Sequence, residues 1–185
     1  MKTCQTRLAE PTEALREAYL EFVAEFAAAG ETDIHGCGAQ LQAGQHFGAF
    51  VQRLRDAGRG VGLKEGYVPA STWWLVRGGR VIGTANLRYA LNDHLRSFGG
   101  HIGYAVRPGE RGKGYGSLQL RLVLDEARRI GLVRVLVACY RDNLASARVI
   151  RRCGGVLEGE AVEPKSGKVL QRYWIELNQK ESEGP

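Results

Sequence analysis

The sequence predicts a mixed α/β (α+β) fold in which helices cover both faces of a mixed, mostly antiparallel sheet. Two amphipathic helical segments come first, and three extended segments follow them. Helical and extended segments then alternate as far as residue 177, with no repeat and no linker. Helices packed on the faces of a sheet are the usual architecture for this order. At 185 residues the chain can bury one sizeable core, so we expect a single domain over residues 1–185.

Two helices are expected in the first third of the chain. Residues 11–30 carry apolar side chains at spacings of three and four, at Leu15, Tyr19, Phe22 and Phe26. A second apolar stripe ends at Gly58 and contains Phe47, Phe50, Val51 and Leu54. Residues 30–38 (GETDIHGCG) are polar and glycine-rich, which indicates a loop that either borders a substrate entrance or only connects the helices.

The pattern then changes from helical to extended. Residues 71–76 (STWWLV) and 80–90 (RVIGTANLRYA) flank Gly78-Gly79, a pair that tolerates positive φ and suits a tight turn. We therefore expect two neighbouring antiparallel strands. Residues 99–106 (GGHIGYAV) form a third extended segment.

Helices and strands alternate in the second half. An apolar stripe predicts a helix over residues 118–130, and branched apolar residues predict a strand over residues 133–140. A short helix over residues 144–153 and a last core strand over residues 169–177 complete the order, and the polar residues from Asn178 onward are expected to fray.

Charge and cysteine usage limit the partners and the compartment. The chain has 26 basic and 20 acidic residues, a formal charge of +6, which favours phosphate-bearing or acidic ligands without choosing among them. Its four cysteines show no metal-ligand spacing, so we expect neither a disulfide framework nor a metal site. No apolar run approaches the roughly 20 residues of a membrane span, and no secretory signal is recognisable. We expect a cytoplasmic protein with no membrane partner.

Residues 107–116 (RPGERGKGYG) join an extended segment to a helical one. A glycine-rich turn at a helix N-terminus exposes N–H groups to which the helix dipole adds partial positive charge, so anions bind there. Arg111 and Lys113 add full charges. A P-loop is excluded because Arg107 and Gly114 occupy two of its required positions, and the dinucleotide fingerprint lacks its closing glycine. The expected ligand group is a phosphate or a pyrophosphate.

The pattern Arg111-x-x-Gly114-x-Gly116 resembles the (Gln/Arg)-x-x-Gly-x-(Gly/Ala) signature of the GNAT superfamily of acetyl-coenzyme A-dependent N-acetyltransferases. Val106-Arg107-Pro108 stands where that family has a hydrophobic-x-Pro step. Residues 133–155 resemble its next strand, asparagine and asparagine-led helix ending in glycine. The resemblance covers residues 72–177 and implies a GNAT-like acyltransferase fold.

The resemblance implies acetyl-CoA as cosubstrate, with no metal. Its pyrophosphate would lie on the main-chain amides of residues 111–117, and its pantetheine arm would follow the strand ending at Val106, which separates from the next strand. A backbone N–H near Val106 would then donate to the thioester oxygen. The residues expected to bind acetyl-CoA are Val106, Arg111, Gly112, Lys113, Gly114, Tyr115, Gly116, Ser117, Asn143 and Ser146. The glycines can also serve the turn alone, and Asn143 can also serve only as a helix N-cap.

Acetyl transfer requires a base that removes a proton from the attacking amine. His101, on the strand that leads to the loop, is the first candidate because an imidazole titrates in the useful range. A structural role for His101 is an open alternative. Glu25, Glu31 and Asp33 are weaker candidates, because nothing in the sequence fixes their distance from the loop.

The leaving-group side departs from the family pattern. Many relatives carry a tyrosine acid at the position of Ile150, which has no proton to give. The acid is therefore left open among Ser146, Tyr140 and a water. Cys139 has no histidine or lysine beside it in the sequence to lower its pKa, so we expect a small apolar residue there, not a nucleophile.

The sequence thus predicts transfer of an acetyl group from acetyl-CoA to a small-molecule or peptide amine, by direct attack in a ternary complex. Arg88 and Tyr104 are the expected acceptor-binding residues, and Asn92 and Tyr89 are further candidates. A non-catalytic acyl-CoA sensor is the alternative, because Ile150 replaces the tyrosine. No nucleic-acid motif is present, so no nucleic-acid partner is expected. The acceptor is not readable from a fold with many substrates, and a homodimer stays open.

Overall fold

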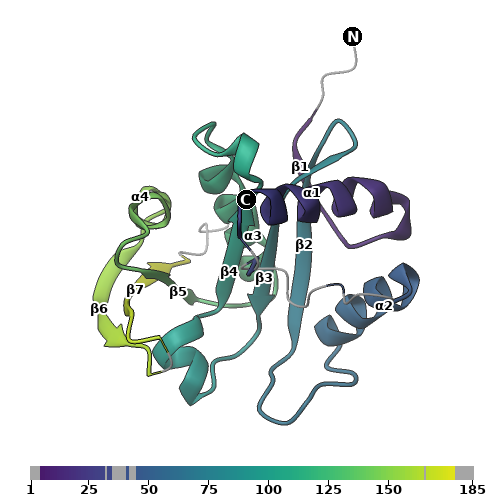
Figure 1. The fold of residues 1–185 in the computed structure, drawn as a ribbon. Helices are drawn as coiled ribbons and strands as arrows, with labels where there is room; N and C mark the ends of the chain where they lie inside the picture. Colours follow the sequence, from purple (N-terminus) through teal and green to yellow (C-terminus); the bar gives the residue numbers. More distant parts are fainter. Residues whose placement is uncertain (1–4, 32, 35–40, 42–44, 165, 178–185) are drawn as a thin grey trace, which may run out of the picture.

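The computed structural model describes residues 5–31, 33–34, 41, 45–164 and 166–177. These residues form a seven-stranded sheet with the order β1-β2-β3-β4-β5-β7-β6 (Figure 1). The strands are β1 (Arg7–Ala9), β2 (Ala70–Arg77), β3 (Arg80–Arg88), β4 (Ile102–Val106), β5 (Arg134–Tyr140), β6 (Val156–Val162) and β7 (Val169–Glu176). The longer helices are α1 (Arg16–Ala28), α2 (Phe47–Gly58), α3 (Tyr115–Arg129) and α4 (Leu144–Arg152). Short helical turns lie at η1 (Glu13–Leu15), η2 (Leu95–Gly99) and η3 (Pro108–Glu110).

The sheet is mixed and mostly antiparallel, as the sequence predicts. Within the described ranges only β4 and β5 pair in parallel. Gly78 and Gly79 have φ values of 57° and 78° between β2 and β3. These positive angles confirm the predicted hairpin turn, because other residues adopt them only at a cost.

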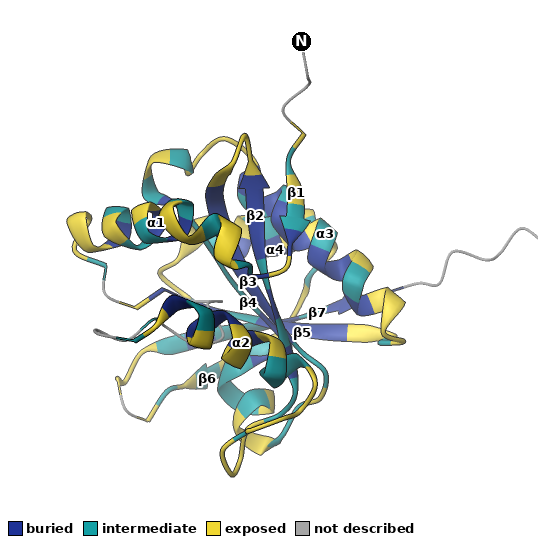
Figure 2. Ribbon diagram, turned by 90° about the vertical axis from the view of Figure 1, so that its right-hand side faces the viewer, coloured by how far each residue is buried: buried dark blue, intermediate teal, exposed yellow. Residues whose placement is uncertain are grey.

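Helices cover both faces of the sheet, which confirms the predicted architecture (Figure 2). On the α1–α2 face, Tyr19 stacks on Trp74 with ring centroids 4.7 Å apart. On the α3–α4 face, Leu120 and Ile150 pack in one core cluster with Tyr173. Because β3 lies between these two layers, every residue from 81 to 87 is buried.

β4 and β5 pair at one position only, Ile102 with Val137. Beyond it the two strands no longer pair, and we call residues 103–106 and 138–140 the β4–β5 split. The predicted separation of these strands is therefore confirmed. It lies directly before η3 and the start of α3.

The register of β4 on β3 decides which main-chain groups face the split. The Arg107 N–H donates to the carbonyl oxygen of Ile82 at 2.8 Å, so residue 107 and the alternate residues before it in β4 face β3. Backbone groups alternate along a strand. The N–H and C=O groups of Tyr104 and Val106 therefore face the split.

Two strands were not predicted. β1 has only three residues, too few for a periodic pattern. β6 is an edge strand, and its Val156 and Val162 are 71% and 61% exposed, so its apolar residues do not mark a buried face. The predicted loop at residues 30–38 lies mostly outside the described residues, and the predicted frayed end from Asn178 lies wholly outside them.

Candidate functional site

Residues 112–117 form the turn that begins α3. Gly112 and Gly114 have φ values of 77° and 86°, and a Cβ on either would have no other atom within 4 Å. None of the main-chain N–H groups of residues 112–117 donates a hydrogen bond within the described part of the chain. These donors lie at the positive end of a 15-residue helix. The turn is therefore open to a ligand and suited to an anion.

Gly116, the last glycine of the motif, serves helix packing. A Cβ there would lie 3.2 Å from Cγ2 of Val149 in α4, so the start of α3 packs closely against the middle of α4. The Tyr115 side chain is buried, and its hydroxyl accepts a hydrogen bond from Arg77. Ser117 is also buried. These residues can offer the ligand their main chain, while their side chains hold the turn.

The two cations of the loop are held by neighbouring oxygens. Arg111 donates to both carboxylate oxygens of Glu31, at 2.7 and 2.8 Å, and through Nε to the Val106 carbonyl at 3.1 Å. The hydrogen bonds to Glu31 raise the pKa of Arg111. Lys113 Nζ lies 3.0 Å from a carboxylate oxygen of Glu110. The main-chain amides are thus the unpaired donors of this loop.

A carboxylate of α1, Glu25, holds the segment before the turn. Glu25 accepts hydrogen bonds from the buried Arg107 and, at 2.6 Å, from the Gly109 N–H. Burial acts to raise the pKa of Glu25, but the bonds from Arg107 and Gly109 and the nearby positive charge bring it below its usual value. The structure therefore places Glu25 and Glu31, two weaker candidates for the base, as anchors between α1 and the loop.

The first turn of α4 meets β4 beside the split. Asn143 caps the helix, because its Oδ1 accepts the Ser146 N–H at 3.0 Å. The Ser146 hydroxyl lies 2.9 Å from the Tyr104 hydroxyl. Burial raises the pKa of Tyr104, so this phenol keeps its proton at neutral pH. The structure thus brings Tyr104, Ser146 and the split together on the α3–α4 face.

Cys139 and Ile150 lie in the same core cluster on that face. Burial raises the pKa of the Cys139 thiol, and a neutral thiol is a weak nucleophile. Ile150 is fully buried. The position at which relatives carry a tyrosine is therefore a core position in this chain.

His101 is buried at the start of β4, with 7% of its surface exposed. Its Nδ1 accepts the Leu136 N–H at 2.9 Å. Burial, followed by the charges of Arg88 and Arg96, lowers the pKa of His101 to about 4. The neutral ring therefore carries its proton on Nε2. Such a ring donates a hydrogen bond through Nε2. It can accept a proton only if the hydrogen bond from the Leu136 N–H to its Nδ1 is broken.

A cavity of about 920 Å³ lies on the α1–α2 face. Its walls are α2, the segment 61–70 and the ends of β2, β3 and η2. Arg88 and Asn92, two of the predicted acceptor-binding residues, line it. Tyr104 instead points to the opposite face of the sheet, where it contacts Ser146.

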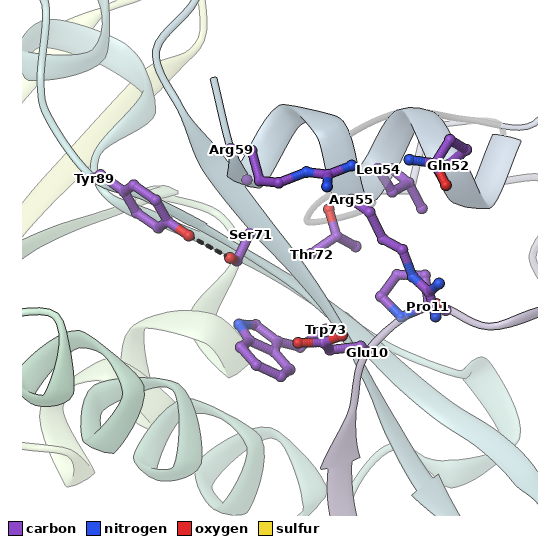
Figure 3. A pocket seen from close by; sticks show the side chains of 11 residues that line it. Glu10, Pro11, Gln52, Leu54, Arg55, Arg59, Ser71, Thr72, Trp73 and Tyr89 are labelled. Atoms are coloured by element: carbon purple, nitrogen blue, oxygen red, sulfur yellow. Dashed lines mark hydrogen bonds between the residues drawn. The ribbon is translucent and has the colours of Figure 1, made fainter. Parts of the chain in front are cut away.

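A smaller hollow of about 530 Å³ adjoins this cavity and shares Leu54 and Thr72 with it. Figure 3 shows Tyr89 and Ser71 on its wall, with their hydroxyl oxygens 2.5 Å apart. Tyr89, a further predicted lining residue, therefore belongs to this hollow and not to the large cavity.

The described residues contain no group of three or more His, Cys, Asp or Glu side chains that could hold a metal ion. None of their helices is long and apolar enough to cross a membrane.

Sequence reasoning missed the contacts of one pair of residues and the whole of another pair. Glu25 and Glu31 were candidates only for the base, and their hydrogen bonds to the loop, from about 80 residues away, have no local signal in the sequence. Thr72 and Asn86 line the cavity and bond to each other at 3.2 Å. Their signal was available, because polar residues at inward positions of apolar strands are usually paired.

A strand pair that splits beside an open, glycine-lined helix start is typical of a class of protein whose geometry suits a long, phosphate-bearing ligand. The family comparison narrows this class. A family model described as "Acetyltransferase (GNAT) domain" matches residues 13–156, so the chain belongs to the GNAT acetyltransferase family. No match was found among proteins of curated function.

Solved structures share the fold at low sequence identity. An acetyltransferase from Salmonella typhimurium that modifies the N-terminal serine of ribosomal protein L7/L12 is 19% identical, with a TM-score of 0.65 over 95% of this chain and 97% of that chain. A spermidine N-acetyltransferase chimera from Vibrio cholerae and hSSAT is 16% identical, with a TM-score of 0.62 over 94% and 96%. The protein yncA from Salmonella typhimurium, solved with its cofactor acetyl-CoA, is 16% identical, with a TM-score of 0.60 over 96% of both chains.

Proposed function

We propose that this protein transfers an acetyl group from acetyl-CoA to the amine of a small molecule or peptide, by direct attack in a ternary complex. The observation that carries the proposal is the position of the β4–β5 split directly before the unpaired amides of residues 112–117. Membership of the GNAT family supports it. So does the relative that was solved with acetyl-CoA.

The chain's residues fit this cosubstrate. The open space above Gly112 and Gly114 admits a diphosphate to the main-chain amides, where a Cβ would intrude. The amides of Tyr104 and Val106 face the split and can donate to the amide and thioester oxygens of the pantetheine arm. Bound acetyl-CoA supplies the thioester that carries the acetyl group.

Two hydroxyls are placed to supply the proton that the leaving thiolate requires. Tyr104 and Ser146 lie 2.9 Å apart on the face where α4 starts. The Tyr104 phenol can pass its proton through the Ser146 hydroxyl to the departing thiolate. The burial that raises the pKa of Tyr104 makes the phenol a weaker acid than an exposed tyrosine, so the raised pKa works against this role. The pair would fill the role that Ile150 cannot fill.

Direct attack is favoured over an acetylated cysteine. Cys139 is buried, and its thiol stays protonated because burial raises its pKa. For the attacking amine, the base role of His101 stays a prediction, conditional on the release of Leu136 by Nδ1. Asp33 stays the other candidate, since it lies close enough to contribute to the pKa shift of Tyr140 at the end of β5.

A non-catalytic acyl-CoA sensor is the second candidate, because Ile150 is a core residue without a proton to give. Measurement of CoA release over a panel of amines separates the two functions. The cysteine usage supports a cytoplasmic location for either.

Binding is tested with Gly114→Glu and its matched control Gly131→Glu. Both glycines have similar positive φ values, of 86° and 85°, and open space at Cβ, but Gly131 follows the far end of α3. Acetyl-CoA should raise the melting temperature of the native protein and of Gly131→Glu, but not that of Gly114→Glu. No heat of binding for the native protein in calorimetry would reject both the transferase and the sensor.

A further inference from the structure

The large cavity on the α1–α2 face is basic. Arg53, Lys64 and Arg88 line it, and no Asp or Glu side chain belongs to its lining within the described residues. Residues 35–44, which surround the lining residue Leu41 in the sequence, contain no acidic residue either. The described lining of this cavity therefore carries cations and no carboxylate.

Arg88 carries the charge nearest the sheet. Burial lowers the pKa of its guanidinium, which shows that the ion is partly removed from water. Its Nη1 donates to the carbonyl oxygens of Gly99 and Gly100, at 3.3 and 3.0 Å. No carboxylate of the described residues forms an ion pair with it. The carbonyls orient the guanidinium, but they do not neutralise it, and even a half-buried charge without a counterion loses part of its hydration.

The cavity lies next to the split. Arg88 is the last residue of β3, and Asn86 stands opposite Gly103 of β4. Gly103 has no side chain to separate the cavity from the far edge of β4, where the split begins. Neighbouring strands are about 5 Å apart, so an anion at Arg88 and an amine in the split would be separated by one to two strand spacings, roughly 5–10 Å.

Acidic side chains lie on the other side of the split. Tyr140, at the end of β5, donates to a Glu163 carboxylate oxygen at 3.0 Å. Asp33 is close enough to act on Tyr140 as well, after burial and Glu163, in raising its pKa. Glu163 and Asp33 thus bring negative charge beside β5, where Lys168 Nζ also lies 5.1 Å from the centre of the Tyr140 ring.

We propose that the acceptor is a small amine that also carries an anionic group, a carboxylate or a phosphate, which Arg88 binds. This inference rests on the proposed function and narrows its substrate class. The planar guanidinium can donate two parallel hydrogen bonds to either a carboxylate or a phosphate. A polyamine is disfavoured, because its second cation would face Arg88.

The first test compares acceptors of matched length with native protein and acetyl-CoA, by CoA release. ω-Amino acids of two to six carbons are compared with their amides, with ω-aminoalkyl phosphates and with α,ω-diamines. The proposal expects kcat/KM for the best acid or phosphate to exceed that of its amide or diamine at least about 10-fold. This factor corresponds to the loss of one charge-assisted hydrogen-bonded pair. Equal or better use of amides or diamines would overturn it. The comparison of the amino acids with the aminoalkyl phosphates shows which of the two anionic groups is preferred.

The second test removes the charge. Arg88→Gln should raise KM for the acid about 10-fold or more and leave KM for the amide unchanged, while Arg88→Lys should restore part of the preference. Arg59→Gln, which removes a charge from the end of α2 outside this cavity, is the matched control and should keep the preference. An acid-to-amide ratio that Arg88→Gln does not change would overturn the role of Arg88. If Arg88→Gln does not fold, the ratio measured with the native protein decides.

A binding experiment distinguishes failure of this inference from failure of the proposed function. If no amine is acetylated, the same acids are titrated into the CoA-loaded protein by calorimetry. Binding of acids but not amides, lost in Arg88→Gln, supports the anion site without acetyl transfer. Equal or absent binding overturns it.

Discussion

The hydroxyl of Tyr104 on β4 lies 2.9 Å from the hydroxyl of Ser146 in the first turn of α4. Relatives in this family carry a tyrosine further along the helix, at the position that Ile150 fills here. A phenol from a strand therefore stands close to the start of that helix. The leaving-group proton can come from a different element of the same fold.

We expect Tyr104→Phe to lower kcat about 10–100-fold, because the proton source is lost while the apolar ring is kept. KM for acetyl-CoA should stay within about twofold, since the amides that bind it are unchanged. Steady-state kinetics with the best acceptor measure both. Tyr89→Phe is the control, because it removes a hydroxyl of a similar pair, with Ser71, from outside the split. Full kcat in Tyr104→Phe would exclude the phenol as the acid.

We expect Glu25→Ala to lower the free energy of unfolding by about 1–2 kcal/mol, because it leaves the buried Arg107 without its closest carboxylate and Glu25 is itself partly exposed. Urea denaturation measures the change. Glu21→Ala is the matched control, since Glu21 lies 4.0 Å from the same guanidinium and is 64% exposed. Equal effects of the two substitutions would show that the contact with Glu25 has no special weight.

The free energy of unfolding should decrease as the pH is lowered, because of His101. Its pKa is about 4 in the folded protein and about 6.5 in an unfolded chain. Above pH 6.5 the ring is neutral in both states, and between pH 6.5 and 4 only the unfolded state gains the proton. The free energy of unfolding should therefore drop by about 2 kcal/mol between pH 7 and pH 5 through this group. Urea denaturation should show a smaller drop in His101→Gln and an unchanged drop in His46→Gln, at an exposed histidine.

Cys139→Ala should keep kcat within about threefold, because a buried, protonated thiol does not act as the nucleophile. A covalent mechanism through this residue would instead lose activity on the order of 1,000-fold or more. The same kinetic assay decides. Mass spectrometry after mixing with acetyl-CoA alone should find no acetylated cysteine.

The fold was predictable where pattern and burial agree. The stripe of α3 and the Gly78-Gly79 turn have strong local signals, and the structure confirms both. β6 had none, because an exposed edge strand shows no apolar face. The candidate site was predictable only in part. The glycine-rich turn is local in sequence, whereas Glu25 and Glu31, the carboxylates that anchor its segment, come from about 80 residues away.

The close approach of Gly116 to Val149 fixes how the start of α3 packs against α4. Under the proposed function, the amides at the start of α3 would bind the diphosphate, and Val149 lies one turn beyond Ser146. The contact would then set the distance between the bound diphosphate and the hydroxyls beside the thioester sulfur. A bulkier residue at either position should push the two helices apart and weaken both acetyl-CoA binding and acetyl transfer.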